Sequence, residues 1–252
     1  FKQKTAYEIP KRDWSSDVCS SDLAAGTKGA KGLSTFLIPS DAAGLKVEGT
    51  ITAFGCEGNT LTRWHHGTAA ALELKDCKVT AAQLLGKENA CPFADGKLLA
   101  RATVSNAAIS IGVGRASYDA AIEYAKIRRQ GGRNIIEHQA IGTKLADCTI
   151  KLELSRNAVW KAAWAYDHPE AVANRTLNDL PLHVIARVAA GESVHEVTLL
   201  AAECFGAMGV MRDMPLQKYV ADGFIFAHSE DTDDAAKLAI AESIAGFQRK
   251  AA

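Results

Sequence analysis

The sequence predicts a mainly α-helical protein in which a small β unit precedes a bundle of about four long helices. Two observations lead to this prediction. Before about residue 94, short β-prone runs are separated by glycine, proline and polar turns. After it, apolar and small residues recur at helical spacing over long stretches. We therefore expect a β domain in residues 24–93 and a helical bundle in residues 94–252.

Residues 1–23, FKQKTAYEIPKRDWSSDVCSSDL, show no hydrophobic period and fit no secondary-structure element. Read back into codons, the segment VCSSDL resembles the end of a widely used sequencing adapter, and residues 2–9 resemble its other end. We interpret residues 1–23 as a non-native, translated adapter, with a genuine N-terminal tail as the alternative. On this interpretation the native reading frame continues upstream of Ala24, and the chain is a fragment of a longer protein.

Three strands are expected in the β unit. Residues 33–38 form a β-prone run closed by Pro39, and a second strand begins at residue 45 after a turn. Residues 72–75 alternate apolar and charged side chains, which is typical of a half-buried strand.

The first long helix is expected over residues 98–126, which are rich in alanine, serine and glycine and apolar on nearly every side. Such a helix is usually buried among others, because small residues allow close approach. Gly131 and Gly132 should end it. The next helix carries one aligned apolar stripe, made of Ile141, Leu145, Cys148, Leu152, Ser155, Val159 and Ala162.

Three further helices complete the predicted bundle. One runs over residues 182–205 and ends at Gly206, a short one follows Pro215, and the last covers residues 232–247.

Composition excludes several classes of function. Lysine plus arginine and aspartate plus glutamate balance at 29 each, so neither a nucleic acid nor a membrane surface is an expected partner. The six cysteines have no paired spacing and no histidine neighbours at metal-ligand spacing, so we expect no metal site. Reduced thiols and the lack of a visible secretory leader favour a cytoplasmic protein.

The segment RRQGGRNIIEHQ, residues 128–139, resembles the acyl-CoA dehydrogenase family. The flanking segments GVGRASYDAAIEYA and ECFGAMGVMRDMPLQKYVADGF are similar to helices of that family, and FLIPSDAAGLKV and LELKDCKVTAAQLLG to strands of its middle domain. The resemblance covers about residues 31–249. It implies a remnant of the middle β-domain followed by the family's C-terminal four-helix bundle.

The resemblance also implies a chemistry. In this family a carboxylate removes the α-proton of an acyl-CoA thioester while a hydride passes from the β-carbon to N5 of the flavin. The base of most members lies just before the last helix, where this chain has Glu230. Some relatives carry it near the start of the long helix at residue 98, but residues 101–104 offer no carboxylate.

The residues around Glu230 also have a purely structural interpretation. SEDTDD before a helix is what any helix N-terminus favours, because acidic and hydroxyl groups cap free N–H groups and complement the dipole. Only the resemblance favours catalysis. Asp231 replaces the family's usual glycine, and this second carboxylate either raises the pKa of the base or caps the helix.

The resemblance implies FAD as the cofactor. Arg128 matches an arginine at the flavin pyrophosphate that reaches across a subunit interface, and Gln130 stands where the family often has threonine or serine. The turn at Gly206 and Ala207 matches one that lies against the partner's ADP moiety. We add two further expected cofactor contacts, Glu203 and Thr232.

Partners follow from the same resemblance. We expect an acyl-CoA substrate, an electron-transfer flavoprotein as electron acceptor, and a homodimer or homotetramer. The truncated chain alone is expected to be inactive. An acyl-CoA oxidase or flavin monooxygenase on the same scaffold is the alternative enzyme, and a non-catalytic assembly module is the alternative outside catalysis.

Overall fold

A computed structural model of the chain describes residues 7–8, 16–22, 33–50, 69–90, 96–172, 180–227 and 233–246. The chain divides into two compact units, residues 1–99 and 100–252. Its mainly helical character confirms the predicted fold class. Among the described helices, none is both long enough and apolar enough to cross a bilayer.

The first unit contains two antiparallel three-stranded sheets, with strand orders β1-β5-β4 and β2-β3-β6. The predicted strands at residues 33, 45 and 72 are all present, and the facing residues Val47 and Leu72 mark the register of β4 and β5. The strands are β1 (Tyr7–Glu8), β2 (Ser16–Asp22), β3 (Leu33–Pro39), β4 (Leu45–Thr50), β5 (Ala69–Leu74) and β6 (Leu84–Leu85).

The prediction that residues 1–23 contain no regular element is wrong for β1 and β2. All seven residues of β2 pair with β3, from Ser16 opposite Pro39 to Asp22 opposite Leu33. An unpaired strand edge offers backbone N–H and C=O groups to any extended segment, whatever its side chains. Pairing therefore does not test the origin of the segment, and the adapter interpretation stays a prediction.

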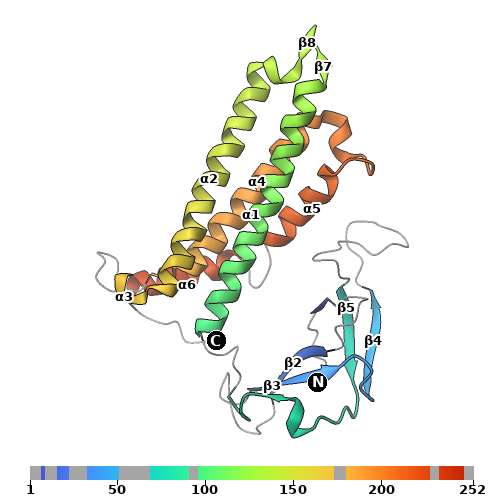
Figure 1. Cartoon of the computed structure of the whole chain (residues 1–252), viewed down its shortest axis with the longest axis vertical. Coiled ribbons are helices and arrows are strands. Elements are labelled where there is room, and N and C mark those ends of the chain that lie inside the picture. The colour runs from blue at the N-terminus through green and yellow to red at the C-terminus, as the bar shows by residue number, and fades with distance from the viewer. Residues whose placement is uncertain are drawn as a thin grey trace. The chain divides into compact units, whose positions relative to one another are not determined.

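The second unit is a helical bundle with a β-hairpin at one end, where α1 meets α2 (Figure 1). The hairpin strands are β7 (Arg129–Gln130) and β8 (Arg133–Asn134). The helices are α1 (Gly96–Ile127), α2 (Gln139–Asp167), α3 (Pro169–Val172), α4 (Leu182–Phe205), α5 (Leu216–Ala227) and α6 (Asp233–Ala245). Short 3-10 turns cover Ile135–Glu137 and Gly206–Val210.

Helix α1 is less enclosed than the sequence predicts. Its buried positions form one stripe of small side chains, while Ile109 is 39% exposed and Ile127 is 76% exposed. Spacing of three and four residues places the stripe on one face. The buried members are Thr103, Ala107, Ser110, Gly114, Ser117, Ala121 and Ala125.

Helices α2 and α4 meet along the centre of the bundle, where Cys148 and Leu152 pack with Val197. The predicted stripe of α2 is buried from Leu145 to Ala162, which confirms the helical spacing read from the sequence. Helix α5 lies close against α4, because a Cβ atom on Gly223 would stand 2.7 Å from Oγ1 of Thr198. Small residues thus set the distances between the helices.

Candidate functional site

The hairpin between α1 and α2 holds Arg128 and Gln130 in place. The N–H of Arg128 donates to the carbonyl oxygen of Tyr124 at 2.9 Å, and its own carbonyl accepts from the N–H of Ile135 at 2.8 Å. The hairpin turn needs two residues with positive φ, and Gly131 and Gly132 supply φ values of 60° and 84°. The glycines therefore shape the hairpin, whereas the helix itself ends earlier, at Ile127.

Three arginines in this hairpin have different surroundings. Arg129 donates to the carbonyl oxygen of Gly132 at 2.9 Å, and Nη2 of Arg133 lies 3.3 Å from Nδ1 of His138. Nε2 of His138 lies 3.0 Å from the carbonyl oxygen of Gln130, so this histidine is structural. Within the described residues, the side chains of Arg128 and Gln130 have no hydrogen-bond or ion-pair partner and are exposed. They are available to a ligand.

The turn after α4 holds Gly206 and Ala207. Gly206 has φ of 59° and its N–H donates to the carbonyl oxygen of Glu203, which ends the helix. Both Gly206 and Ala207 are exposed, and a Cβ atom on Gly206 would meet nothing within 4 Å. Gly209 differs, because a Cβ atom there would lie 2.5 Å from the carbonyl oxygen of Ala202. The turn is therefore open to a ligand at Gly206 and closely packed against α4 at Gly209.

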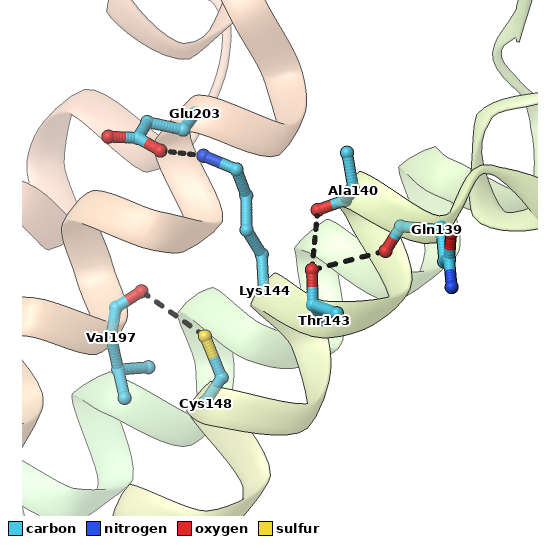
Figure 2. Close-up of polar contacts among 7 residues, drawn as sticks. All are labelled: Gln139, Ala140, Thr143, Lys144, Cys148, Val197 and Glu203. Carbon is cyan, nitrogen blue, oxygen red and sulfur yellow. Dashed lines mark hydrogen bonds and ion pairs between the residues drawn. The ribbon is translucent and has the colours of Figure 1, made fainter.

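Glu203 is engaged by a lysine that sequence reasoning missed. Figure 2 shows Lys144 of α2 reaching across to the carboxylate of Glu203 on α4. The hydrogen bond to Glu203 raises the pKa of Lys144, against a smaller opposing effect of burial. The two residues lie 59 positions apart, so no local pattern points to their pairing. The predicted cofactor role of Glu203 remains a prediction, and its carboxylate already links two helices.

This ion pair predicts a pH dependence of stability. Because the folded-state pKa of Lys144 is raised, its contribution is complete below the pKa of an unfolded lysine, about 10.4, and disappears as pH rises through the folded value. Lys144→Met should lower the free energy of unfolding at pH 7 by less than about 1 kcal/mol, since the pair is partly exposed. Urea unfolding of both proteins between pH 7 and 11 measures the difference.

A double-mutant cycle with Glu203→Gln is the control for that prediction. If the two side chains stabilise the protein through each other, the effects of the single substitutions will not add in the double variant. Additive effects at pH 7 would show that the ion pair contributes nothing to stability.

The hairpin and the turn after α4 lie at the same end of the bundle. The ring of Tyr124, one turn before the end of α1, stacks on the ring of Phe205, the last residue of α4, with centroids 4.1 Å apart. Leu145 and Leu216 are buried in the same cluster. The structure therefore brings Arg128 and Gly206 to one end, whereas Glu230 and Thr232 lie outside the described residues.

The buried cysteines offer no nucleophile. Desolvation raises the pKa of the Cys148 thiol to about 12, and burial likewise raises the pKa of Cys204. Both thiols therefore stay protonated at neutral pH. Sγ of Cys148 lies 3.9 Å from the carbonyl oxygen of Val197 (Figure 2). In the part of the chain that the structure describes, no cluster of three histidine, cysteine or carboxylate side chains could hold a metal ion.

Known proteins resemble both the sequence and the fold. Residues 94–245 match the family described as acyl-CoA dehydrogenase, C-terminal domain. The short-chain specific acyl-CoA dehydrogenase, mitochondrial, of Sus scrofa is 29% identical over 211 residues, which cover 84% of this chain and 48% of that protein. The 3-sulfinopropanoyl-CoA desulfinase of Paraburkholderia xenovorans is 35% identical over 144 residues, which cover 57% and 35%.

A solved structure of glutaryl-coenzyme A dehydrogenase in complex with glutaryl-CoA superimposes with a TM-score of 0.74. It is 28% identical and covers 94% of this chain and 56% of that one. The chain spans about half the length of the curated relatives it matches. Because the family match covers more than half of the chain and the helical bundle agrees with it, the chain belongs to the acyl-CoA dehydrogenase family.

Proposed function

We propose that this chain forms part of a flavin-dependent acyl-CoA dehydrogenase that introduces an α,β double bond into an acyl-CoA thioester. Residues 24–93 then belong to the middle β-domain and residues 94–252 form the C-terminal bundle. The family match supports this proposal, and the relatives that it resembles include enzymes named for short-chain acyl-CoA and glutaryl-CoA.

In the proposed mechanism, Glu230 takes the α-proton of the thioester. The α-proton is only weakly acidic, so the base needs a site that excludes water, and the developing enolate oxygen needs hydrogen-bond donors. The backbone N–H of the base itself is one such donor in this family. FAD, when bound, supplies the acceptor for the hydride that leaves the β-carbon.

The side chains at the hairpin end of the bundle fit a dinucleotide. Arg128 presents an exposed guanidinium without a partner among the described residues, while its backbone is anchored on both sides. A guanidinium suits the paired oxygens of a pyrophosphate. Gln130 would add an amide, and the open surface at Gly206 and Ala207 would admit the ADP moiety. Glu203 and Thr232 complete the proposed contacts. The exposed guanidinium of Arg128, which has no partner among the described residues, is the observation on which the cofactor proposal rests.

Replacing Arg128 should weaken FAD binding. Loss of a charge-assisted hydrogen bond costs about 1.5–3 kcal/mol, so Arg128→Gln is expected to raise the dissociation constant of FAD about 10- to 150-fold. Arg128→Lys should fall between, because an ammonium keeps the charge but cannot bind two oxygens in one plane. Titration of flavin fluorescence in a protein of the relatives' length measures the change. Arg115→Gln removes a surface arginine paired with Asp119 on the same helix and should leave FAD affinity unchanged.

We also propose the partners and compartment of the whole enzyme. Its electrons pass to an electron-transfer flavoprotein, and it assembles as a homodimer or homotetramer, since the arginine at position 128 is proposed to reach FAD across a subunit interface. The free thiols of Cys77, Cys148 and Cys204 favour a reducing compartment such as the cytoplasm.

The experiment that tests the proposed function compares the 252-residue chain with a protein whose reading frame extends to the length of the relatives. We expect the longer protein to purify with FAD and to reduce its flavin with a panel of acyl-CoA thioesters, with electron-transfer flavoprotein as acceptor. The 252-residue chain should bind flavin poorly and show no turnover. Rapid oxygen consumption by the reduced flavin would favour the oxidase or monooxygenase, and absence of flavin in both proteins would favour the assembly module.

A further inference from the structure

Helix α4 carries a buried arginine near its N-terminal end. Arg187 is 5% exposed, and the residues on either side of it, Ala186 and Val188, are buried as well. A guanidinium stays charged in a protein, and a buried charge is destabilising unless an anion pairs with it. The packing around α4 limits which carboxylate can reach Arg187.

The contacts between α4 and α5 locate Arg187 along the bundle. A Cβ atom on Gly191 would stand 3.1 Å from Cα of Ala227, the last residue of α5. A Cβ atom on Gly223 would stand 2.7 Å from Oγ1 of Thr198, so the two helices run antiparallel. Arg187 lies one turn before Gly191 on the same face of α4, which places it about 6 Å beyond the end of α5. The chain therefore leaves α5 beside Arg187.

The three helices that pack around this part of α4 offer no acid at the level of Arg187. Helix α1 carries no acid before Asp119, which lies more than about three turns away. The acids of α2 on either side of this level, Glu153 and Asp167, are exposed. Asp222 of α5 is buried, but it lies about 13 Å farther along the bundle.

The next acids along the chain lie in the segment that carries the proposed base. Glu230 and Asp231 follow the end of α5 by three and four residues and lie outside the described residues. Helix α6 begins two residues later and packs on α4, where Lys237 bonds to Glu192 at 2.5 Å. Glu192 lies five positions after Arg187. The helices at both ends of this segment thus contact the same stretch of α4.

We propose that Arg187 is a positioning residue for the base, and that its guanidinium pairs with the carboxylate of Asp231. This rests on the proposed function, in which Glu230 must stay free to take a proton. Asp233 begins α6, where a carboxylate complements the helix dipole. Asp231 has neither role. Its pairing would hold the segment against α4 and neutralise a carboxylate that otherwise disfavours the ionised form of Glu230.

A double-mutant cycle in the 252-residue chain tests the pairing without flavin or substrate. Arg187→Met leaves a carboxylate without its cation and is expected to raise the equilibrium constant of unfolding at least about 100-fold. Asp231→Asn removes the charge but keeps an oxygen for the guanidinium, so its own effect should be about tenfold. Added to Arg187→Met, it should change the constant less than about twofold, because the charge that it removes is then unpaired. Urea unfolding measures all four proteins.

Matched variants show whether the coupling is specific. Lys151→Met removes a lysine that pairs with Glu196 of α4, and its effect should add to that of Asp231→Asn. The effects of Arg187→Met and Glu230→Gln should add as well. If Arg187→Met alone does not fold, recovery of folding on addition of Asp231→Asn supports the pair, and failure to recover overturns it.

Flavin reduction tests the positioning role in a protein of the relatives' length. At saturating acyl-CoA, Arg187→Met should slow the reduction about 10- to 100-fold, because the base is no longer held in place. Arg187→Lys keeps the charge and should recover most of the rate, which the loss of a purely structural contact would not predict. FAD affinity should stay unchanged, since the contacts proposed for Arg128 lie at the other end of α4.

The outcomes separate this proposal from the proposed function. Additive effects of Arg187→Met and Asp231→Asn overturn the pair and leave α,β-dehydrogenation standing. Coupling of Arg187→Met to Glu230→Gln instead would assign the cation to Glu230 and overturn Asp231 as its partner. If Arg187 and Asp231 couple but Glu230→Gln leaves the rate unchanged, the proposed base is overturned, and with it the positioning role of Arg187.

Discussion

Replacing Glu230 with glutamine is expected to lower the rate of α,β-dehydrogenation by about 10²- to 10⁴-fold, the usual contribution of a general base. Glutamine keeps the size and much of the hydrogen bonding of the side chain but cannot take a proton. FAD binding should persist, because the proposed pyrophosphate contact is made by Arg128, which lies in a different segment of the chain from Glu230. Stopped-flow reduction of the flavin by an acyl-CoA, in a protein of the relatives' length, measures the rate.

Asp231→Asn is the matched control for Glu230→Gln. It removes the neighbouring carboxylate and leaves the proposed base intact, so we expect flavin reduction to stay within about tenfold of the unsubstituted protein. If Glu230 only caps the last helix, its replacement should instead lower thermal stability and leave the rate of reduction unchanged. A rate that falls with Asp231→Asn and not with Glu230→Gln would move the base to Asp231.

Replacing Gly209 with alanine is expected to destabilise the bundle by about 1–3 kcal/mol, the usual cost of overpacking a tight contact. The added Cβ would stand 2.5 Å from the carbonyl oxygen of Ala202, a backbone atom that cannot rotate away. The turn after α4 must then shift, and with it Gly206 and Ala207. We therefore expect weaker FAD binding as well as a lower midpoint of urea unfolding.

Gly112→Ala is the control for the same change of side chain. Gly112 lies inside α1, where an added Cβ would meet nothing within 4 Å. Alanine favours the helix over glycine by about 1 kcal/mol, so this variant should be as stable as the unsubstituted chain or more so. Equal stability of the two alanine variants would mean that the turn relaxes around Gly209 without cost.

The helices could be predicted from the sequence because the residues that end a helix, and the spacing of its apolar residues, are local features of the chain. Gly206 ends α4 through its positive φ, and the stripe from Leu145 to Ala162 follows the helical period. The prediction for residues 1–23 was wrong at Ser16–Asp22, since strand pairing there depends on the edge of β3 rather than on the segment's own pattern. Helix α1 is also more exposed than expected, because composition does not show how many other helices pack against it.

The candidate site, like the fold, could be predicted only in part from the sequence. Arg128 and Gln130 could be assigned to FAD by resemblance to the family. The sequence does not show, however, that Arg129 and Arg133 make contacts within the hairpin region while the side chain of Arg128 has no partner among the described residues. Glu203 was assigned to the cofactor, and its link to Lys144 appears only when α2 and α4 lie together.

The sequence by itself determined the helices, the turns and the family, because spacing, glycines and short motifs act within a few residues of one another. Tertiary structure alone decided which side chains meet. Contacts such as Tyr124 with Phe205 and Lys144 with Glu203 join positions far apart in the chain, and only the packing of helices brings them within reach. It also decided which apolar side chains stay exposed, such as Leu154 and Trp160 of α2, because burial depends on the segments that pack nearby and not on residue type alone.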